Sequence, residues 1–160
     1  MMPRRARRDA HAGACAYAAS APFRRCLLFH FIMPTLEVYL PAGHPDARKA
    51  ELIDRLTAAT VAAIGAPVES VRILLNALPA AHIGLGGRSA ADGAPPALPV
   101  IVAILIAGRT DEQKRALIAA LSDASAAVLD APLQAIRVIV KDIPTTDFGI
   151  GGNTARALGR

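Results

Sequence analysis

The sequence predicts an α+β fold in which two β-α-β units form one four-stranded sheet with two helices on one face. This prediction rests on strand-like alternation of apolar residues, on the helical spacing that follows it, and on the return of both patterns 65 residues later. The repeat holds its register without an insertion to the end of the chain. Matching pairs include Pro34 and Pro99, Gly43 and Gly108, Lys49 and Lys114, Arg72 and Arg137, and Gly84 and Gly149. The chain therefore contains one small unit written twice.

The repeat also predicts the domain organisation. We expect residues 34–93 to form the first unit and residues 94–160 the second, with a Gly- and Pro-containing linker over residues 88–97. Units of about sixty residues bury little core alone, so the two should pack as one compact body. Residues 1–33 are rich in Arg, Ala and Ser. They predict either a targeting peptide or an unstructured stretch upstream of a true start at Met33.

The first unit shows each element of the pattern. Residues 35–40 alternate polar and apolar side chains and predict a strand. Asp46 is placed to cap a helix over residues 46–64, and Gly65 follows where a helix end often needs a left-handed residue. Residues 71–75 predict the second strand.

The second unit repeats this plan. Thr110 and Gln113 have the spacing of a capping box at the start of its helix. Its predicted elements are a strand over residues 98–106, a helix that ends near residue 129, and a strand over residues 135–141. Irregular glycine-rich tails, at residues 79–87 and 147–152, follow the second strand of each unit.

The order of elements sets the topology. A helix between two strands makes a parallel crossover, which is right-handed in nearly all proteins. Two such units place both helices on one face of the sheet. The other face then needs cover, which predicts an oligomer.

Charge and cysteine usage exclude several classes of function. The net charge of +5 comes from residues 1–33, which hold six arginines and one aspartate, while the repeats are neutral. The repeats therefore offer no basic excess to nucleic acid. Both cysteines lie in the same leader, the histidines lack ligand spacing, and the longest apolar run is too short for a bilayer. We expect a cytoplasmic protein with no metal, cofactor, membrane or nucleic-acid partner.

Three arginines are candidates for anion binding. Arg72 and Arg137 interrupt otherwise apolar strands. Each is either at a sheet edge in water, paired with a carboxylate, or available to an anion. Arg109 follows Gly108 at the end of a strand, where ligand-binding residues are common, although a solvated charge is the plainer interpretation.

Pro34 directly follows Met33, and this order has a chemical consequence. Removal of an initiator methionine would leave Pro34 with a free secondary amine, which is a base, whereas an internal proline nitrogen is an amide. Neighbouring guanidinium groups and apolar burial would lower the pKa of this amine. Such a base could take a proton alpha to a carbonyl, with arginines holding the carboxylate and stabilising the dienolate.

Together these residues resemble a known family. From residue 34 to its end the chain is similar to two fused copies of the 4-oxalocrotonate tautomerase subunit, with the second copy the better match. The motifs that carry the resemblance are GRTDEQK at residues 108–114, LDAP at 129–132, IRVI at 136–139 and FGIGG at 148–152. The resemblance implies an isomerase with the tautomerase fold, an amino-terminal proline base, two substrate-binding arginines and an aromatic wall. It also implies six β-α-β units per assembly, hence a homotrimer of this chain.

The two copies match the family unequally. Pro34 matches the catalytic proline, but the first copy has His44 and Ile83 where the family has an arginine and an aromatic residue. The second copy has Arg109 and Phe148 at those positions.

Its own proline, Pro99, is internal and cannot be a base. We therefore expect one working site per chain, with Pro34 as the base and with Arg109 and Phe148 binding substrate. Arg72 or Arg137, which both match the strand arginine, would come from a neighbouring subunit.

Other functions stay open from the sequence. Relatives in the superfamily include acrylate dehalogenases and hydratases, which need an added acid, but Leu85 and Ile150 stand in the tail where one might be expected. Asp142 and Asp147 lie nearby without clearly taking that part. If residues 1–33 are retained, Pro34 is an amide, and the chain would be a small-acid binder or a structural oligomer. The favoured substrate is a small anionic 2-oxo or 2-hydroxy-dienoate acid.

Overall fold

The computed structural model describes residues 33–93 and 98–159. The predicted leader, apart from Met33, and part of the predicted linker lie outside these residues. Neither long helix in the described ranges is long and apolar enough to cross a membrane.

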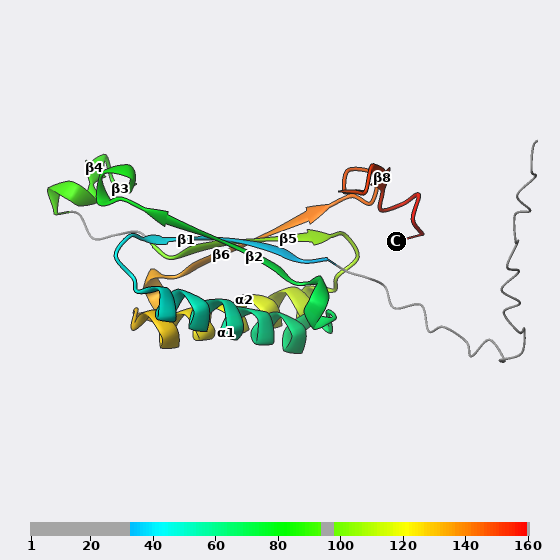
Figure 1. The fold of residues 1–160 in the computed structure, drawn as a ribbon, viewed down its shortest axis with the longest axis horizontal. Helices are drawn as coiled ribbons and strands as arrows, with labels where there is room; N and C mark the ends of the chain where they lie inside the picture. The colour runs from blue at the N-terminus through cyan, green and yellow to red at the C-terminus, as the bar shows by residue number, and fades with distance from the viewer. Residues whose placement is uncertain (1–32, 94–97, 160) are drawn as a thin grey trace, which may run out of the picture.

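Four strands form one mixed sheet in the order β2-β1-β5-β6 (Figure 1). β1 (Thr35–Pro41) runs parallel to β2 (Arg72–Leu78), and β5 (Val100–Ile106) runs parallel to β6 (Arg137–Ile143). The two first strands meet antiparallel at the centre of the sheet. The predicted pair of β-α-β units is confirmed. The two units are joined into one sheet by the antiparallel pairing of their first strands.

Both long helices cover the same face of the sheet, as predicted (Figure 1). α1 (Asp46–Ile64) and α2 (Asp111–Leu129) pack against each other and against the central strands. The buried core between these layers consists mainly of Leu36, Val38, Leu40, Leu52, Leu56, Ile101, Ala103, Leu105, Leu117 and Leu121. Thr60 and Ser125 hold equivalent places in the two helices, where their buried hydroxyls donate to the carbonyls four residues earlier. The core therefore leaves neither hydroxyl unpaired.

The two helices begin differently. Thr110 and Gln113 form the predicted capping box at the start of α2. The prediction for Asp46 was wrong: it is the first helical residue, Pro45 holds the cap position, and no side chain caps the backbone. The Asp46 carboxylate instead accepts a hydrogen bond from Lys49 Nζ at 3.0 Å. Proline fits just before the helix because it has no backbone N–H, so it leaves no donor without a partner at the helix start.

The caps give a first prediction about stability. Thr110→Ala should lower the free energy of unfolding by about 1 kcal/mol, because the backbone N–H of Gln113 loses the Thr110 hydroxyl to which it donates. Asp46→Ala is the matched control at the start of α1 and should cost no more than about 0.5 kcal/mol, since it removes only an exposed ion pair. Urea unfolding of both variants measures the difference. Equal losses would show that the capping box does not stabilise the fold.

Short elements complete each unit. Both tails form two-stranded hairpins, which rise beyond the ends of the sheet on the side away from the helices (Figure 1). The hairpins are β3 (Gly84–Leu85) with β4 (Arg88–Ser89), and β7 (Gly149–Ile150) with β8 (Asn153–Thr154). Single 3₁₀ turns are η1 (Val68–Ser70), η2 (Ala80–His82), η3 (Ala90–Asp92) and η4 (Leu133–Ala135).

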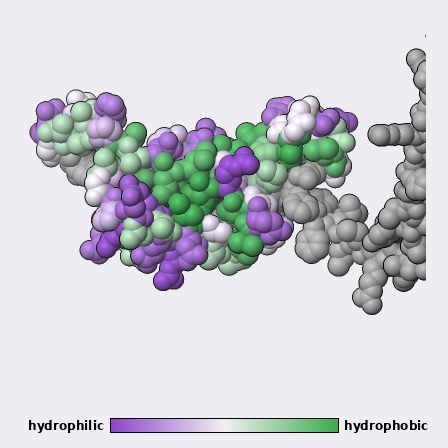
Figure 2. Space-filling view, viewed as in Figure 1, coloured by the Kyte–Doolittle hydropathy of each residue, from purple (hydrophilic) through white to green (hydrophobic). Residues whose placement is uncertain are grey.

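The second face of the sheet carries no helix and is partly apolar. Leu74 and Ile139, at equivalent places in β2 and β6, are each 47% exposed. Figure 2 shows apolar residues over the strand layer in the middle of the molecule, with hydrophilic residues over the helical layer below. Large apolar side chains exposed to water on a sheet face are typical of a surface that associates with another chain.

Candidate active site

The sheet register brings Pro34 and Arg109 to one end of the molecule. Thr35 at the start of β1 pairs with Ile104 near the end of β5, and the loop that carries Arg109 follows β5. The opposite end holds the equivalent residues of the other copy, because Tyr39 pairs with Val100. Pro34 and Arg109, which the sequence divides between the two copies, thus lie at the same end of the sheet.

Pro34 is fully buried at the edge of the core. Its carbonyl accepts a hydrogen bond from the backbone N–H of Arg72 at 2.9 Å, which fixes the start of β1 against the start of β2. Pro99 is also fully buried and accepts the same bond from Arg137 at 3.1 Å. The two prolines therefore share their burial and this hydrogen bond, but the peptide bond between Leu98 and Pro99 is cis.

Arg109 has the features of an anion-binding residue. Its Nε and Nη2 atoms are buried, and neither has a hydrogen-bond partner in the described part of the chain. Burial lowers the pKa of the Arg109 guanidinium from its ordinary value, and the negative charge of Asp142 partly offsets this. An arginine stays protonated despite such a shift, so these two buried donors could bind an anion such as a carboxylate.

Asp142, whose charge acts on Arg109, is itself paired with another cation. Its carboxylate forms an ion pair with Lys114, whose side chain comes from the first turns of α2. Both side chains are only about one-third exposed or less, at 34% for Asp142 and 27% for Lys114. Sequence reasoning considered Asp142 only as an acid for water activation and did not single out Lys114. The partners are 28 positions apart in the sequence, so no local pattern reveals the pair.

The strand arginines lie on the face of the sheet that no helix covers. Arg72 pairs with Thr35, and paired residues on neighbouring strands share a face. Since side chains alternate along a strand, Pro34 faces the helical side and Arg72 the open side. Arg72 therefore does not face Pro34 of its own chain.

Arg137 lies at the other end of the sheet and differs from Arg72 in its partners. Its Nη1 donates to the carbonyls of Gln134 at 2.5 Å and Ile136 at 3.0 Å. The Arg72 side chain is exposed and has no such bond within residues 33–93 and 98–159. The expectation that one of these arginines serves a neighbouring subunit stays a prediction.

Phe148 stands directly before β7, in the hairpin at the Pro34 end (Figure 1). It is half-buried, whereas Ile83 at the equivalent place is only 7% exposed. An aromatic ring that is partly open to solvent can form one wall of a ligand site. Within one chain, then, Pro34, Arg109 and Phe148 lie at one end, and His44, Ile83 and Arg137 at the other.

Comparison with protein families agrees with this duplicated plan. The family model described as tautomerase enzyme matches residues 34–93 and matches again over residues 99–157. The chain belongs to the tautomerase family. Its two copies are both tautomerase units, and they differ at the candidate site positions.

The tautomerase relatives include single-unit and fused proteins. The 2-hydroxymuconate tautomerase of Stutzerimonas stutzeri is 46% identical over 63 residues, which is 39% of this chain and 100% of that protein. A crystal structure of a native fused 4-OT is 84% identical, covers 79% of this chain and 99% of its own, and superposes with a TM-score of 0.77. A fused 4-OT described as an asymmetric trimer is 69% identical at the same coverage, with a TM-score of 0.74.

A more distant tautomerase structure belongs to the cis-3-chloroacrylic acid dehalogenase family. It is 30% identical, covers 75% of this chain and 82% of its own, and has a TM-score of 0.66. The shared fold is therefore compatible with more than one reaction, and the side chains must decide between them.

Proposed function

We propose that this tautomerase catalyses keto–enol proton transfer on a small 2-hydroxy-dienoate or 2-oxo acid. The observation that carries the proposal is that Nε and Nη2 of Arg109 are buried without a hydrogen-bond partner among the described residues, at the same sheet end as Pro34. The names of the single-unit and fused relatives support the same reaction.

Pro34 acts as the base once Met33 has been removed. Its neutral amine takes the hydroxyl proton of the 2-hydroxy-dienoate, the electron pair forms the 2-oxo group, and the ammonium returns a proton to carbon of the same substrate. Full burial and nearby positive charge favour the neutral amine near neutral pH. The proton is thereby moved without any cofactor.

Arg109 holds the substrate carboxylate and stabilises the negative charge that develops on the oxygen during transfer. A guanidinium that is already partly desolvated interacts more strongly with this charge than one in water. Phe148 supplies an apolar wall, and Arg72 or Arg137 reaches the site from a neighbouring chain across the open sheet face. The site is then complete only in the oligomer, which we propose to be a homotrimer, as described for fused relatives.

The assay that tests this function follows ketonisation of 2-hydroxymuconate by ultraviolet absorbance. A preparation that begins at Pro34 should turn over with enzyme-like kcat/KM. The double variant Arg109→Ala, Phe148→Ala should lose most of this activity. Full activity in that variant would remove the proposed site.

Lys114 gives a prediction about substrate affinity. Lys114→Met releases Asp142, which can then pair with Arg109 and compete with the substrate carboxylate. We expect KM to rise about fivefold with little change in kcat, because a partly exposed ion pair contributes about 1 kcal/mol. The second substitution Asp142→Asn should restore the original KM.

A matched control exists in the first copy. Lys49 is the equivalent lysine, and it pairs with Asp46 on the surface rather than with a residue near Arg109. Lys49→Met should leave KM unchanged. An equal rise in KM for both lysine variants would show that Lys114 does not act through Asp142.

The dehalogenase-family neighbour makes hydrolysis of a haloacrylate the second candidate. That reaction needs an acid free to activate water. Asp142 is engaged by Lys114, and Asp147 is exposed and accepts a hydrogen bond from Thr146. Chloride release from 3-chloroacrylate should therefore be far slower than keto–enol transfer, and comparable rates would favour the second candidate.

A further inference from the structure

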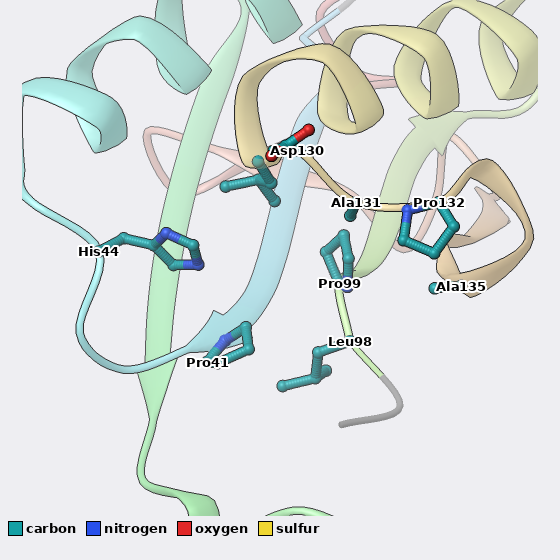
Figure 3. A pocket seen from close by; sticks show the side chains of 9 residues that line it. Pro41, His44, Leu98, Pro99, Asp130, Ala131, Pro132 and Ala135 are labelled. Atoms are coloured by element: carbon teal, nitrogen blue, oxygen red, sulfur yellow. The ribbon is translucent and has the colours of Figure 1, made fainter. Parts of the chain in front are cut away.

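A cavity of about 380 Å³ lies at the end of the sheet away from Pro34, around the start of β5 (Figure 3). Most of its wall is apolar, and two polar side chains, His44 and Asp130, also line it. Figure 3 shows His44 on the loop that leads into α1 and Asp130 at the end of α2, with Pro99 across from His44. Among the described residues, no lysine or arginine lines this cavity, so the full charge on its wall is that of a carboxylate.

The Asp130 carboxylate is free to pair with a ligand. Its side chain forms no hydrogen bond and no ion pair within residues 33–93 and 98–159. Arg48 reaches the same helix end, where its Nη1 donates to the carbonyl of Val128 at 2.9 Å, but it does not line the cavity. Arg48 offsets part of the negative charge at the carboxyl end of α2, and Asp130 adds to that charge. This side of the cavity therefore attracts a cation.

Asp130 also occupies a backbone position that favours glycine. It follows α2 in the left-handed conformation with φ 52°, and the equivalent residue after α1 is Gly65 with φ 65°. Glycine adopts this conformation freely, whereas it costs most other residues about 1 kcal/mol, and aspartate tolerates it better than most. The second copy thus carries a carboxylate where the first copy has no side chain.

The two ends of the sheet consequently differ in the sign of their charge. A shift of 65 residues maps His44 onto Arg109 and Asp130 onto Gly65. At these two places the Pro34 end has a guanidinium and no acid. The other end has an acid and an imidazole, and a neutral imidazole can accept a hydrogen bond, which a guanidinium cannot. A carboxylate ligand suits the first arrangement, and an ammonium ligand suits the second.

We propose that this cavity binds a small organic ammonium ion with an apolar body. The Asp130 carboxylate pairs with the ammonium group, a ring nitrogen of neutral His44 accepts one of its hydrogens, and the apolar wall contacts the hydrocarbon part. A metal ion fits less well, because no third His, Cys, Asp or Glu of the described residues joins these two to complete a set of ligands. The site is separate from the proposed reaction, since it uses neither Pro34 nor Arg109.

The test is isothermal titration of the assembled protein with 2-phenylethylammonium at about pH 8, where imidazole side chains are mostly neutral. We expect one molecule to bind per chain. Asp130→Asn keeps the size of the side chain and tolerates the left-handed backbone, and it should weaken binding about tenfold because the ion pair is lost. 2-Phenylethanol has nearly the same shape without the charge, and it should bind the unmodified protein about tenfold more weakly than the ammonium ion.

The matched control is Asp123→Asn, which removes an exposed acid of α2 that does not line the cavity and should leave binding unchanged. A second variant keeps the test decisive if Asp130→Asn disturbs the end of α2. Ala135→Leu fills the cavity from η4 and should abolish binding of both compounds.

Three results would overturn the inference. They are no binding of the ammonium ion to the unmodified protein, unchanged binding in both the Asp130→Asn and Ala135→Leu variants, and equal binding of the ammonium ion and the alcohol. Failure of the proposed function has a different signature, in which the protein has no keto–enol activity but still binds the ammonium ion through Asp130.

Discussion

Keeping Met33 on the chain should lower kcat/KM for keto–enol transfer at least about 100-fold relative to the chain that begins at Pro34. In the retained form the Pro34 nitrogen is an amide and cannot accept a proton. The rest of the site is unchanged, so KM should move much less than kcat. Intact mass identifies each preparation, and stopped-flow absorbance on 2-hydroxymuconate gives its rate.

Pro99 provides the matched control for this experiment. It has the same burial and the same backbone hydrogen bond as Pro34 but is internal in every form of the chain. Pro99→Ala should therefore keep kcat/KM within about threefold of the original, whereas Pro34→Ala should lose most of it. Full activity in a chain that retains Met33 would rule out the amine as the base.

Substitution of Arg109 by alanine should lower kcat/KM about 100-fold or more. Among residues 33–93 and 98–159, Arg109 is the residue whose buried side-chain nitrogens have no hydrogen-bond partner, and its removal takes that charge away from the dienolate. Arg109→Lys should recover only part of the loss, because an ammonium keeps the charge but not the planar fork. Steady-state kinetics of the three proteins on one substrate measures both effects.

His44 is the control for Arg109. It holds the equivalent place at the other end, and His44→Ala should leave kcat/KM unchanged. A large loss of turnover in His44→Ala with normal turnover in Arg109→Ala would mean that the working site lies at the opposite end of the sheet.

Much of the fold follows from the repeat. The offset of 65 residues predicts two equal β-α-β units, and the apolar spacing gives both helices with their observed ends. The second strands extend further than predicted, to Leu78 and Ile143, because backbone pairing continues past the apolar run. Asp46 failed as a cap because the preceding Pro45 already occupies that position, and the local pattern of acid before helix does not separate the two.

Less of the site could be predicted, because it depends on contacts far apart in the sequence. The separation of functional residues between the copies was visible in the sequence, but only the antiparallel pairing of β1 and β5 brings Pro34 near the Arg109 loop. The burial of Arg109 and the ion pair between Lys114 and Asp142 are tertiary features. The alternation of side chains in β2 then explains why Arg72 faces away from Pro34 of its own chain.

The central claim is that Pro34 carries a neutral amine that removes the proton. The most direct measurement is ¹⁵N NMR of the proline-labelled protein that begins at Pro34, titrated alongside the pH dependence of kcat/KM. We expect one titrating proline nitrogen, with a pKa below that of an ordinary prolyl amine because burial and Arg109 disfavour the ammonium form. Since only the neutral amine is active, kcat/KM should rise with pH through this same pKa. Arg109→Ala should raise the pKa of the Pro34 amine. A Pro34 nitrogen that stays protonated across the pH range in which activity rises would contradict the account.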